Sequence, residues 1–250
     1  VAHIAIGNGT ASRETEQMTV ELIRRLGGGV SYMIVNEAGA SVYSASKLAA
    51  EEFPDYDVNL RSAVSIARRL QDPLAELVKI DPKSIGVGQY QHDMPQARLD
   101  ETLSGVVEDC VNAVGVDLNT ASAPLLSYVA GLNNTTARNI VKYREENGAF
   151  TTRKGVLKVP KLGPKAFEQC AGFLRVPESR NVLDHTGVHP ESYGAAETLL
   201  ALCGYGLSDV KAGGLDGLRE RVAAYGEEKA AQACGVGVPT LRDIVGELVK

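Results

Sequence analysis

The sequence predicts a mainly α-helical protein with an α/β part at its N-terminal end. Residues 1–62 alternate short apolar runs with helical patterns, which is the order of a parallel βαβ unit. From residue 63 onward, apolar side chains recur at the spacing of helices. Aromatic residues make up 5% of the 250 residues and tryptophan is absent, which suits small helical modules packed through alanine, leucine and valine.

Within the first part, the predicted order is strand, helix, strand, helix, over residues 3–6, 12–26, 32–35 and 45–52. Thr10 or Ser12 is expected to cap the first helix, because a hydroxyl can accept from its unpaired N–H groups. The same helix should bury an apolar face made of Met18, Val20, Leu22, Ile23 and Leu26.

Glu37 directly follows the second predicted strand, at the edge of an α/β sheet where functional groups collect. A two-metal nuclease would need several carboxylates converging there. The Gly7-Asn8-Gly9 turn does not have the GxGxxG pattern, so it is interpreted as an ordinary strand-to-helix turn. Glu37 is therefore the only catalytic candidate, and a vestigial one.

Residues 63–116 are expected to form a helical connector. Pro73 should kink or divide its first helix, and a later helix covers residues 96–114. His92 and Asp93 lie in the loop between them, with no further ligand type at metal-binding spacing. No metal and no cofactor is expected.

Residues 117–176 contain two consecutive helix–turn–helix units, with turns at residues 130–133 and 160–163. Pro164 opens the helix after the second turn, at the position that proline prefers. Tight turns need residues that tolerate positive φ, so this conformation is expected at Gly131, Gly163 and Asn133.

These two turns are the candidate binding site for a phosphate backbone. A missing side chain lets a phosphate approach, and the following helix directs unpaired N–H groups and its positive end toward it. Such contacts carry no base preference. The predicted nucleic-acid-binding residues are Gly131, Leu132, Asn133, Thr135, Arg138, Lys142, Lys161, Leu162, Gly163 and Lys165.

Local charge supports this interpretation. Residues 119–175 carry nine basic and three acidic residues, a local charge of +6, whereas the whole chain has a net charge of −5. A basic segment in an acidic protein is typical of nucleic-acid binding. The alternative is an ordinary solvated helical surface.

Residues 182–250 are expected to form a second helical domain with a hairpin of the same kind, after a linker over 177–181. The Gly235–Pro239 turn is the better hairpin candidate, and the segment 202–207 repeats the pattern only superficially. Acidic residues outnumber basic ones in this part, so phosphate binding is not expected here.

The chain has no apolar run of membrane-spanning length and no signal peptide, and its four scattered cysteines suit reduced thiols of a cytoplasmic protein. It starts without methionine and inside a predicted strand, so we expect a fragment of a longer protein.

Two parts of the sequence resemble known protein families. The phrases NTAS at 119–122, YREENGAF at 143–150 and LGPK at 162–165 resemble tandem helix-hairpin-helix modules, although each hairpin keeps one of the two usual glycines. The segments IAIGNGTASRETEQ at 4–17 and VNEAGASVYSAS at 35–46 resemble the RNase H-like (YqgF-type) domain of the Tex transcription accessory protein family. Residues 61–94 continue this match.

The resemblance implies a partial RNase H-like domain over 1–62, the tandem helix-hairpin-helix domain over 117–176 and a second such domain over 182–250, without the S1 domain of the family. Glu37 matches the family's second acidic position. The last one falls near Arg61 and Ser62, neither of which binds a metal, so the chain is not expected to be an enzyme.

The predicted function is non-catalytic, sequence-independent binding of RNA or DNA in support of transcription, with proteins of the transcription machinery as further partners and no membrane. Two alternatives remain. One is a metal-dependent nuclease centred on Glu37, and the other is a protein-interaction scaffold in which the hairpins only pack domains together.

Overall fold

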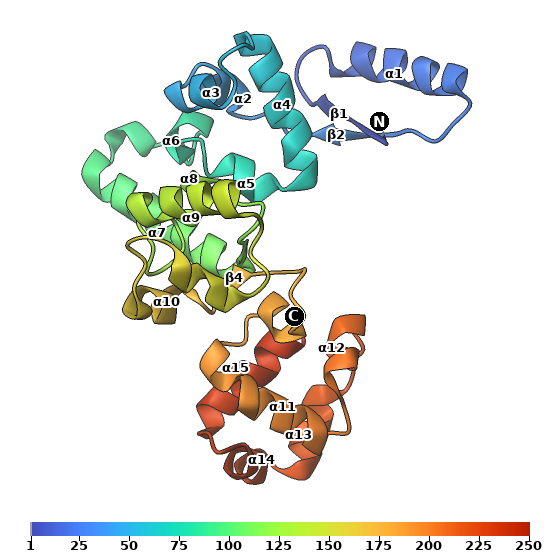
Figure 1. Cartoon of the computed structure of the whole chain (residues 1–250). Helices are drawn as coiled ribbons and strands as arrows, with labels where there is room; N and C mark the ends of the chain where they lie inside the picture. Colours follow the sequence, from blue (N-terminus) through green and yellow to red (C-terminus); the bar gives the residue numbers. More distant parts are fainter. Residues whose placement is uncertain (1) are drawn as a thin grey trace. The chain divides into compact units, whose positions relative to one another are not determined.

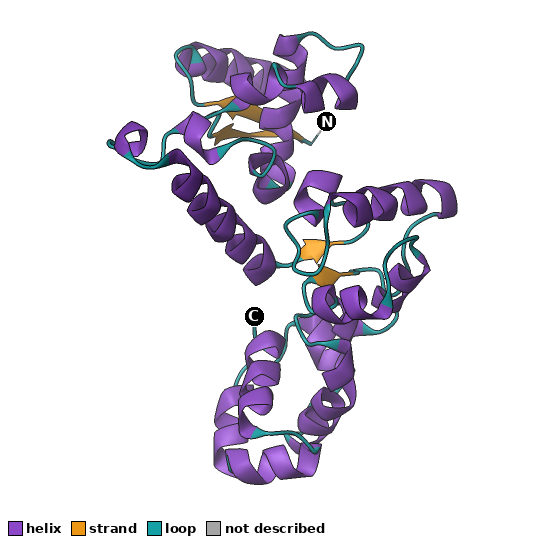
Figure 2. Ribbon diagram, turned by 90° about the vertical axis from the view of Figure 1, so that its left-hand side faces the viewer, coloured by secondary structure: helices purple, strands orange, loops and turns teal. Residues whose placement is uncertain are grey.

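The computed structural model describes residues 2–250, which divide into two compact units, one ending at Val107 and one running from Glu108 to Lys250. Figure 1 shows the elements in chain order, and Figure 2 shows that most of the chain is helical, with strands in two small pairs. The mainly α fold with an α/β part at its N-terminal end is confirmed. None of the described helices has the length and apolarity needed to cross a lipid bilayer.

The N-terminal unit opens with the predicted parallel βαβ arrangement. Strands β1 (His3–Gly7) and β2 (Ser31–Val35) pair in parallel, with Ile6 opposite Ile34, and α1 (Ser12–Leu26) connects them. This element order and the strand bounds agree with the sequence-based prediction to within one residue.

Two details of α1 differ from the prediction. Its N-cap residue is Ala11, whose side chain cannot accept a hydrogen bond, so neither Thr10 nor Ser12 caps the helix. The expected apolar face is not buried as a whole, because a sheet of two strands is too narrow to cover it. The exposed large apolar residues of α1 are Met18, Leu22 and Leu26.

The helix predicted over residues 45–52 is confirmed but starts two residues later, at Lys47. Its N-cap residue is Ser46, whose hydroxyl accepts from the Ala49 N–H (3.1 Å). The short helix before it, over Ala40–Ser44, was not predicted. Pro73 divides the next helical stretch as expected. The helices here are α2 (Ala40–Ser44), α3 (Lys47–Glu52), α4 (Val58–Gln71), α5 (Pro73–Leu77), α6 (Pro82–Ile85) and a short 3-10 helix (Gln91–Asp93). Helix α4 runs without a break across residues 62 and 63.

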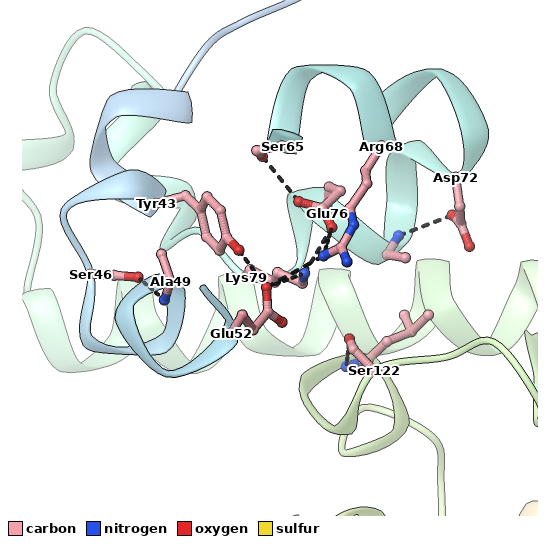
Figure 3. Close-up of polar contacts among 12 residues, drawn as sticks. Tyr43, Ser46, Ala49, Glu52, Ser65, Arg68, Asp72, Glu76, Lys79 and Ser122 are labelled. Atoms are coloured by element: carbon pink, nitrogen blue, oxygen red, sulfur yellow. Dashed lines mark hydrogen bonds and ion pairs between the residues drawn. The ribbon is translucent and has the colours of Figure 1, made fainter. Parts of the chain in front are cut away.

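A buried polar network joins these helices (Figure 3). The ammonium group of Lys79 lies 2.7 Å from Glu76 Oε1 and 3.0 Å from Glu52 Oε2. Ser65 Oγ donates to Glu76 Oε2 (3.0 Å), and the Tyr43 hydroxyl donates to Glu52. Burial raises the pKa of Tyr43, so its hydroxyl stays protonated and remains a donor.

In the second unit, the final turns of α7 (Gln96–Val114, as predicted) lead into the tandem helix–turn–helix region. Its two ends are joined by a parallel pair of short strands, in which Val116 lies opposite Leu174. The core between them is apolar and fully buried at Leu118, Leu126 and Ile140. The elements are β3 (Val116–Asp117), α8 (Ala123–Leu126), α9 (Asn134–Asn147), a 3-10 helix (Arg153–Lys158), α10 (Pro164–Cys170) and β4 (Leu174–Arg175).

The remaining helices pack around a second apolar core that includes Leu183, Leu199, Leu218 and Leu241. They follow two short 3-10 helices, Val182–His185 and Pro190–Ser192. In chain order they are α11 (Tyr193–Leu202), α12 (Leu207–Ala212), α13 (Leu218–Tyr225), α14 (Glu227–Cys234) and α15 (Val238–Leu248).

Candidate nucleic-acid interface

Four turns of the second unit share one backbone geometry. In each, a residue with positive φ is followed by a hydrophobic residue and then by an extended residue that starts the next helix. Both turns of the tandem region have this geometry, and so do two turns of the last domain, at residues 204–206 and 235–237. The prediction that segment 202–207 resembles a hairpin only superficially is therefore wrong in its backbone geometry. The four positive-φ residues are Gly131, Lys161, Gly204 and Gly235, with φ of 81°, 66°, 73° and 68°.

The predicted positions of positive φ are therefore partly wrong. Gly131 has it, but Asn133 (φ −137°) and Gly163 (φ −86°) are extended. Both are N-cap residues, which take extended backbone angles while their carbonyl accepts the first helical hydrogen bond. In the second hairpin the left-handed residue is Lys161, and within residues 2–250 it is the only one that is not glycine.

The first hairpin connects α8 to α9 and is closed by its own hydrogen bonds. Asn133 Oδ1 accepts from the N–H groups of Thr135 (2.9 Å) and Thr136 (3.0 Å), and Thr136 Oγ1 accepts from the Asn133 N–H (2.8 Å). The Leu132 N–H donates to Val129 O (3.0 Å). Most of the amides that were predicted to hold a phosphate here are thus already paired within the protein.

The second hairpin, between the Arg153–Lys158 helix and α10, is open. The Leu162 N–H donates to Val159 O, but the N–H groups of Gly163, Lys165 and Ala166 have no acceptor within residues 2–250. A Cβ atom placed on Gly163 would meet no heavy atom within 4 Å. The space beside this turn is therefore free for a ligand, and its donors are unpaired.

The two hairpins also contact each other's helices. A Cβ atom on Gly131 would lie 2.5 Å from Cβ of Gln169 in α10, so glycine is needed for this close approach. Conversely, Asn139 Nδ2 in α9 donates to Pro160 O of the second turn (2.8 Å). Gly131 therefore has a packing role, and Asn139 fixes the second hairpin against α9.

The same face of α9 carries a cation. Lys142 lies three residues after Asn139, and therefore on the helix face that contacts Pro160. Lys142 also pairs with Glu146 at 3.7 Å. The exposed basic residues of the tandem region are Arg138, Lys142, Lys154, Lys158, Lys161 and Lys165.

Three of the nine basic residues counted in this region do not belong to that surface. Arg153 is fully buried, Arg144 donates to Leu118 O (3.0 Å), and Arg175 donates to Gly172 O (2.6 Å). Burial lowers the pKa of all three guanidinium groups, that of Arg175 to about 10. Their guanidinium groups donate to backbone carbonyl groups of the fold, so six exposed cations and three exposed acids (Glu145, Glu146 and Glu168) remain on the surface of this region.

Glu37, the other predicted site residue, lies in the N-terminal unit beside a cavity of about 390 Å³ that Thr10, Ser12 and Thr15 also line. A Cβ atom on Gly7 or Gly9 would lie about 2 Å from its carboxylate, so the two glycines leave room for it. Arg69 Nη1 holds the loop by donating to the carbonyls of Asn36 (2.8 Å) and Ala38 (2.9 Å). Within residues 2–250, His, Cys, Asp and Glu side chains do not gather in groups of three that could hold a metal ion.

Three known protein families match successive parts of the chain. Residues 1–71 match the Tex protein YqgF-like domain, residues 111–175 the helix-hairpin-helix motif, and residues 181–250 the HHH domain.

The chain is also similar along nearly its whole length to larger proteins. It is 60% identical over 250 residues to the transcriptional accessory protein Tex of Neisseria gonorrhoeae (99% of this chain, 32% of that protein) and 57% identical over 248 residues to protein tex of Bordetella pertussis (99% and 31%). It is 42% identical over 300 residues to the S1 RNA-binding domain-containing protein 1 of Homo sapiens (98% and 30%). The chain thus spans about a third of the length of these curated relatives.

Proposed function

Since the chain is a Tex-family sequence, with a Tex YqgF-like domain followed by helix-hairpin-helix domains, we propose that it holds the phosphate backbone of RNA or DNA, without catalysis, as part of a transcription accessory protein. Proteins of the transcription machinery are proposed as further partners of the longer relatives.

The observation that carries this proposal is the open second hairpin. Unpaired N–H groups at Gly163 and Lys165 and the free space beside Gly163 are what an approaching phosphate oxygen needs. Lys161 in this turn and Lys165 in the first turn of α10 are exposed and add attraction that salt weakens. All these contacts would be to the backbone of the nucleic acid, so binding is expected to be independent of sequence.

Replacing Gly163 with valine is expected to weaken nucleic-acid binding by roughly tenfold or more, since a lost hydrogen bond to a charged group costs about 1.5–3 kcal/mol. Valine suits the extended backbone at this position and meets no protein atom, so the fold should be unchanged. Fluorescence anisotropy with RNA and DNA oligonucleotides, single- and double-stranded, measures the affinity, and circular dichroism checks the fold.

A charge variant separates electrostatic attraction from the contact itself. Lys161→Glu/Lys165→Glu should give a shallower slope of log K against log salt, by about 0.9 for each duplex phosphate no longer neutralised. Lys211→Glu/Lys229→Glu is the matched control, because it makes the same change of charge at exposed lysines of the last domain. Equal affinity and slope in both pairs and in Gly163→Val would instead favour the scaffold alternative.

For the nuclease alternative, we propose that the chain does not cleave nucleic acid. The segment expected to supply the last carboxylate has Arg61, whose Nε donates to Phe53 O (3.0 Å), followed by Ser62. Incubation with Mg²⁺ or Mn²⁺ is expected to leave labelled RNA and DNA intact, and Glu37→Gln should bind them as the wild type does. Metal-dependent cleavage that disappears in Glu37→Gln would refute this part of the proposal.

A further inference from the structure

The two hairpins of the tandem region are equivalent in backbone geometry but not in the state of their amides. Val129 and Val159, Leu132 and Leu162, and Asn133 and Gly163 occupy matching positions. They differ at the residue that starts the helix: the second hairpin has a glycine there, and the first has a side chain that reaches back onto the backbone.

We infer that the carboxamide of Asn133 excludes a backbone phosphate from the first hairpin, so that the tandem region holds one segment of phosphate backbone rather than two. This inference rests on the proposed function, since it assumes that the second hairpin binds phosphate. Asn133 is then a specificity-determining residue, although it need not touch the nucleic acid.

The hydrogen bonds of Asn133 support this role. Its Oδ1 lies 2.9 Å from the Thr135 nitrogen and 3.0 Å from the Thr136 nitrogen, as an anionic oxygen would at an open hairpin. The reciprocal bond from the Asn133 N–H to Thr136 Oγ1 (2.8 Å) completes a capping box and holds the asparagine in this position. A phosphate would have to displace a side chain that is already well paired.

Two further contacts make the first hairpin a packing element. Gly131 lies against Gln169 of α10, where even a Cβ atom would be 2.5 Å away. The Leu132 N–H is paired with Val129 O (3.0 Å). The second hairpin has free space at Gly163 and exposed lysines at 161 and 165.

The consequence concerns the class of nucleic acid that is bound. Two open hairpins on one module could contact both strands of a duplex, whereas one open hairpin contacts a single strand. The number of phosphates neutralised by this region should therefore be the same for a duplex and for its single strand. That number is the slope of log K against log salt divided by about 0.9 for a duplex and about 0.7 for a single strand.

The test is to open the first hairpin with Asn133→Gly. Glycine removes the acceptor, permits the same backbone angles and is itself one of the favoured N-cap residues, so the helix should still start there. Binding to a labelled DNA duplex should tighten, and the slope of log K against log salt should steepen by about 0.9, the value for one additional phosphate. Asn133→Asp is the control that keeps an acceptor, and it should show no such gain.

The outcomes are separable. If the wild-type chain binds the duplex and neither Asn133→Gly nor Asn133→Ala changes the affinity or the slope, the inference is overturned and the proposed function stands. If the wild-type chain binds neither the duplex nor its single strand, the proposed function itself fails. Thermal unfolding of each variant checks that the fold is retained, and Asn133→Ala supplies the same test if the glycine variant does not fold.

Discussion

Replacing Arg153 with methionine is expected to lower the free energy of unfolding of the unit formed by residues 108–250 by at least about 3 kcal/mol, because each buried carbonyl group left without its donor costs about 1–3 kcal/mol. The guanidinium of Arg153 is fully buried and donates to the carbonyls of Val188 (2.7 Å), Thr186 (2.6 Å), Asp184 (3.0 Å) and Leu183 (3.2 Å). One side chain of the tandem region thus holds the first segment of the last domain.

A buried carboxylate near the guanidinium enlarges the effect. The Asp184 carboxylate accepts from the backbone N–H of Arg153 (3.1 Å) and from the Ser179 and Tyr193 hydroxyls (both 2.7 Å). Methionine fills a similar volume but leaves the carboxylate without its nearby cation and four carbonyl groups without a donor.

Urea unfolding followed by circular dichroism measures this loss, and Lys154→Met is the matched control. Lys154 is the next residue and is exposed, and its replacement removes the same charge. The free energy of unfolding of Lys154→Met should therefore differ from that of the wild type by no more than about 0.5 kcal/mol. Indistinguishable midpoints for the two variants would show that the buried guanidinium is not important for stability.

In the N-terminal unit, Lys79→Met is expected to lower the free energy of unfolding by about 3–5 kcal/mol, the range for removing one partner of a buried ion pair. The side chains of Lys79 and Glu76 are each only 3% exposed, and Lys79 is the closest cation to both Glu76 and Glu52. Arg68 lies farther away, 3.5 Å from Glu52 and 3.7 Å from Glu76, and is itself partly exposed. Removing the ammonium group leaves two carboxylates facing each other (Figure 3).

The control for Lys79 is Lys47→Met. Lys47 pairs with Glu51 at 3.5 Å, but its side chain is 91% exposed, so this pair should contribute about 0–1 kcal/mol. Adding Glu76→Gln to Lys79→Met should recover part of the lost stability, because it removes the uncompensated charge. A double variant less stable than Lys79→Met alone would contradict this account of the network.

Much of this fold could be predicted from local patterns. The apolar runs of β1 and β2, the period of α7 and the Gly-rich turns depend on residues close in sequence, and the structure has them where expected. The helix expected from residue 45 starts at Lys47 after the N-cap residue Ser46, whereas the five-residue helix over Ala40–Ser44 was not predicted.

The candidate site was harder to predict because its chemistry depends on contacts between distant residues. Arg153 has the sequence surroundings of a surface residue, and only the fold brings Asp184 and the 183–188 carbonyls around it. Asn133 was expected to tolerate positive φ, but asparagine is also a favoured N-cap residue, and that preference prevailed. The sequence could place the hairpins but not decide which of their amides were free.

Lys161 occupies a backbone conformation that lowers the stability of the turn. A residue with a Cβ atom in the left-handed region costs about 1–2 kcal/mol relative to ordinary backbone angles, and glycine takes the same position in the other three hairpins. A procedure that selects for thermal stability alone would therefore choose Lys161→Gly, and it would discard the cation at the tip of the open turn. Thermostability and retention of ligand affinity are opposing objectives at this residue, so an engineered version of this domain has to be screened for both.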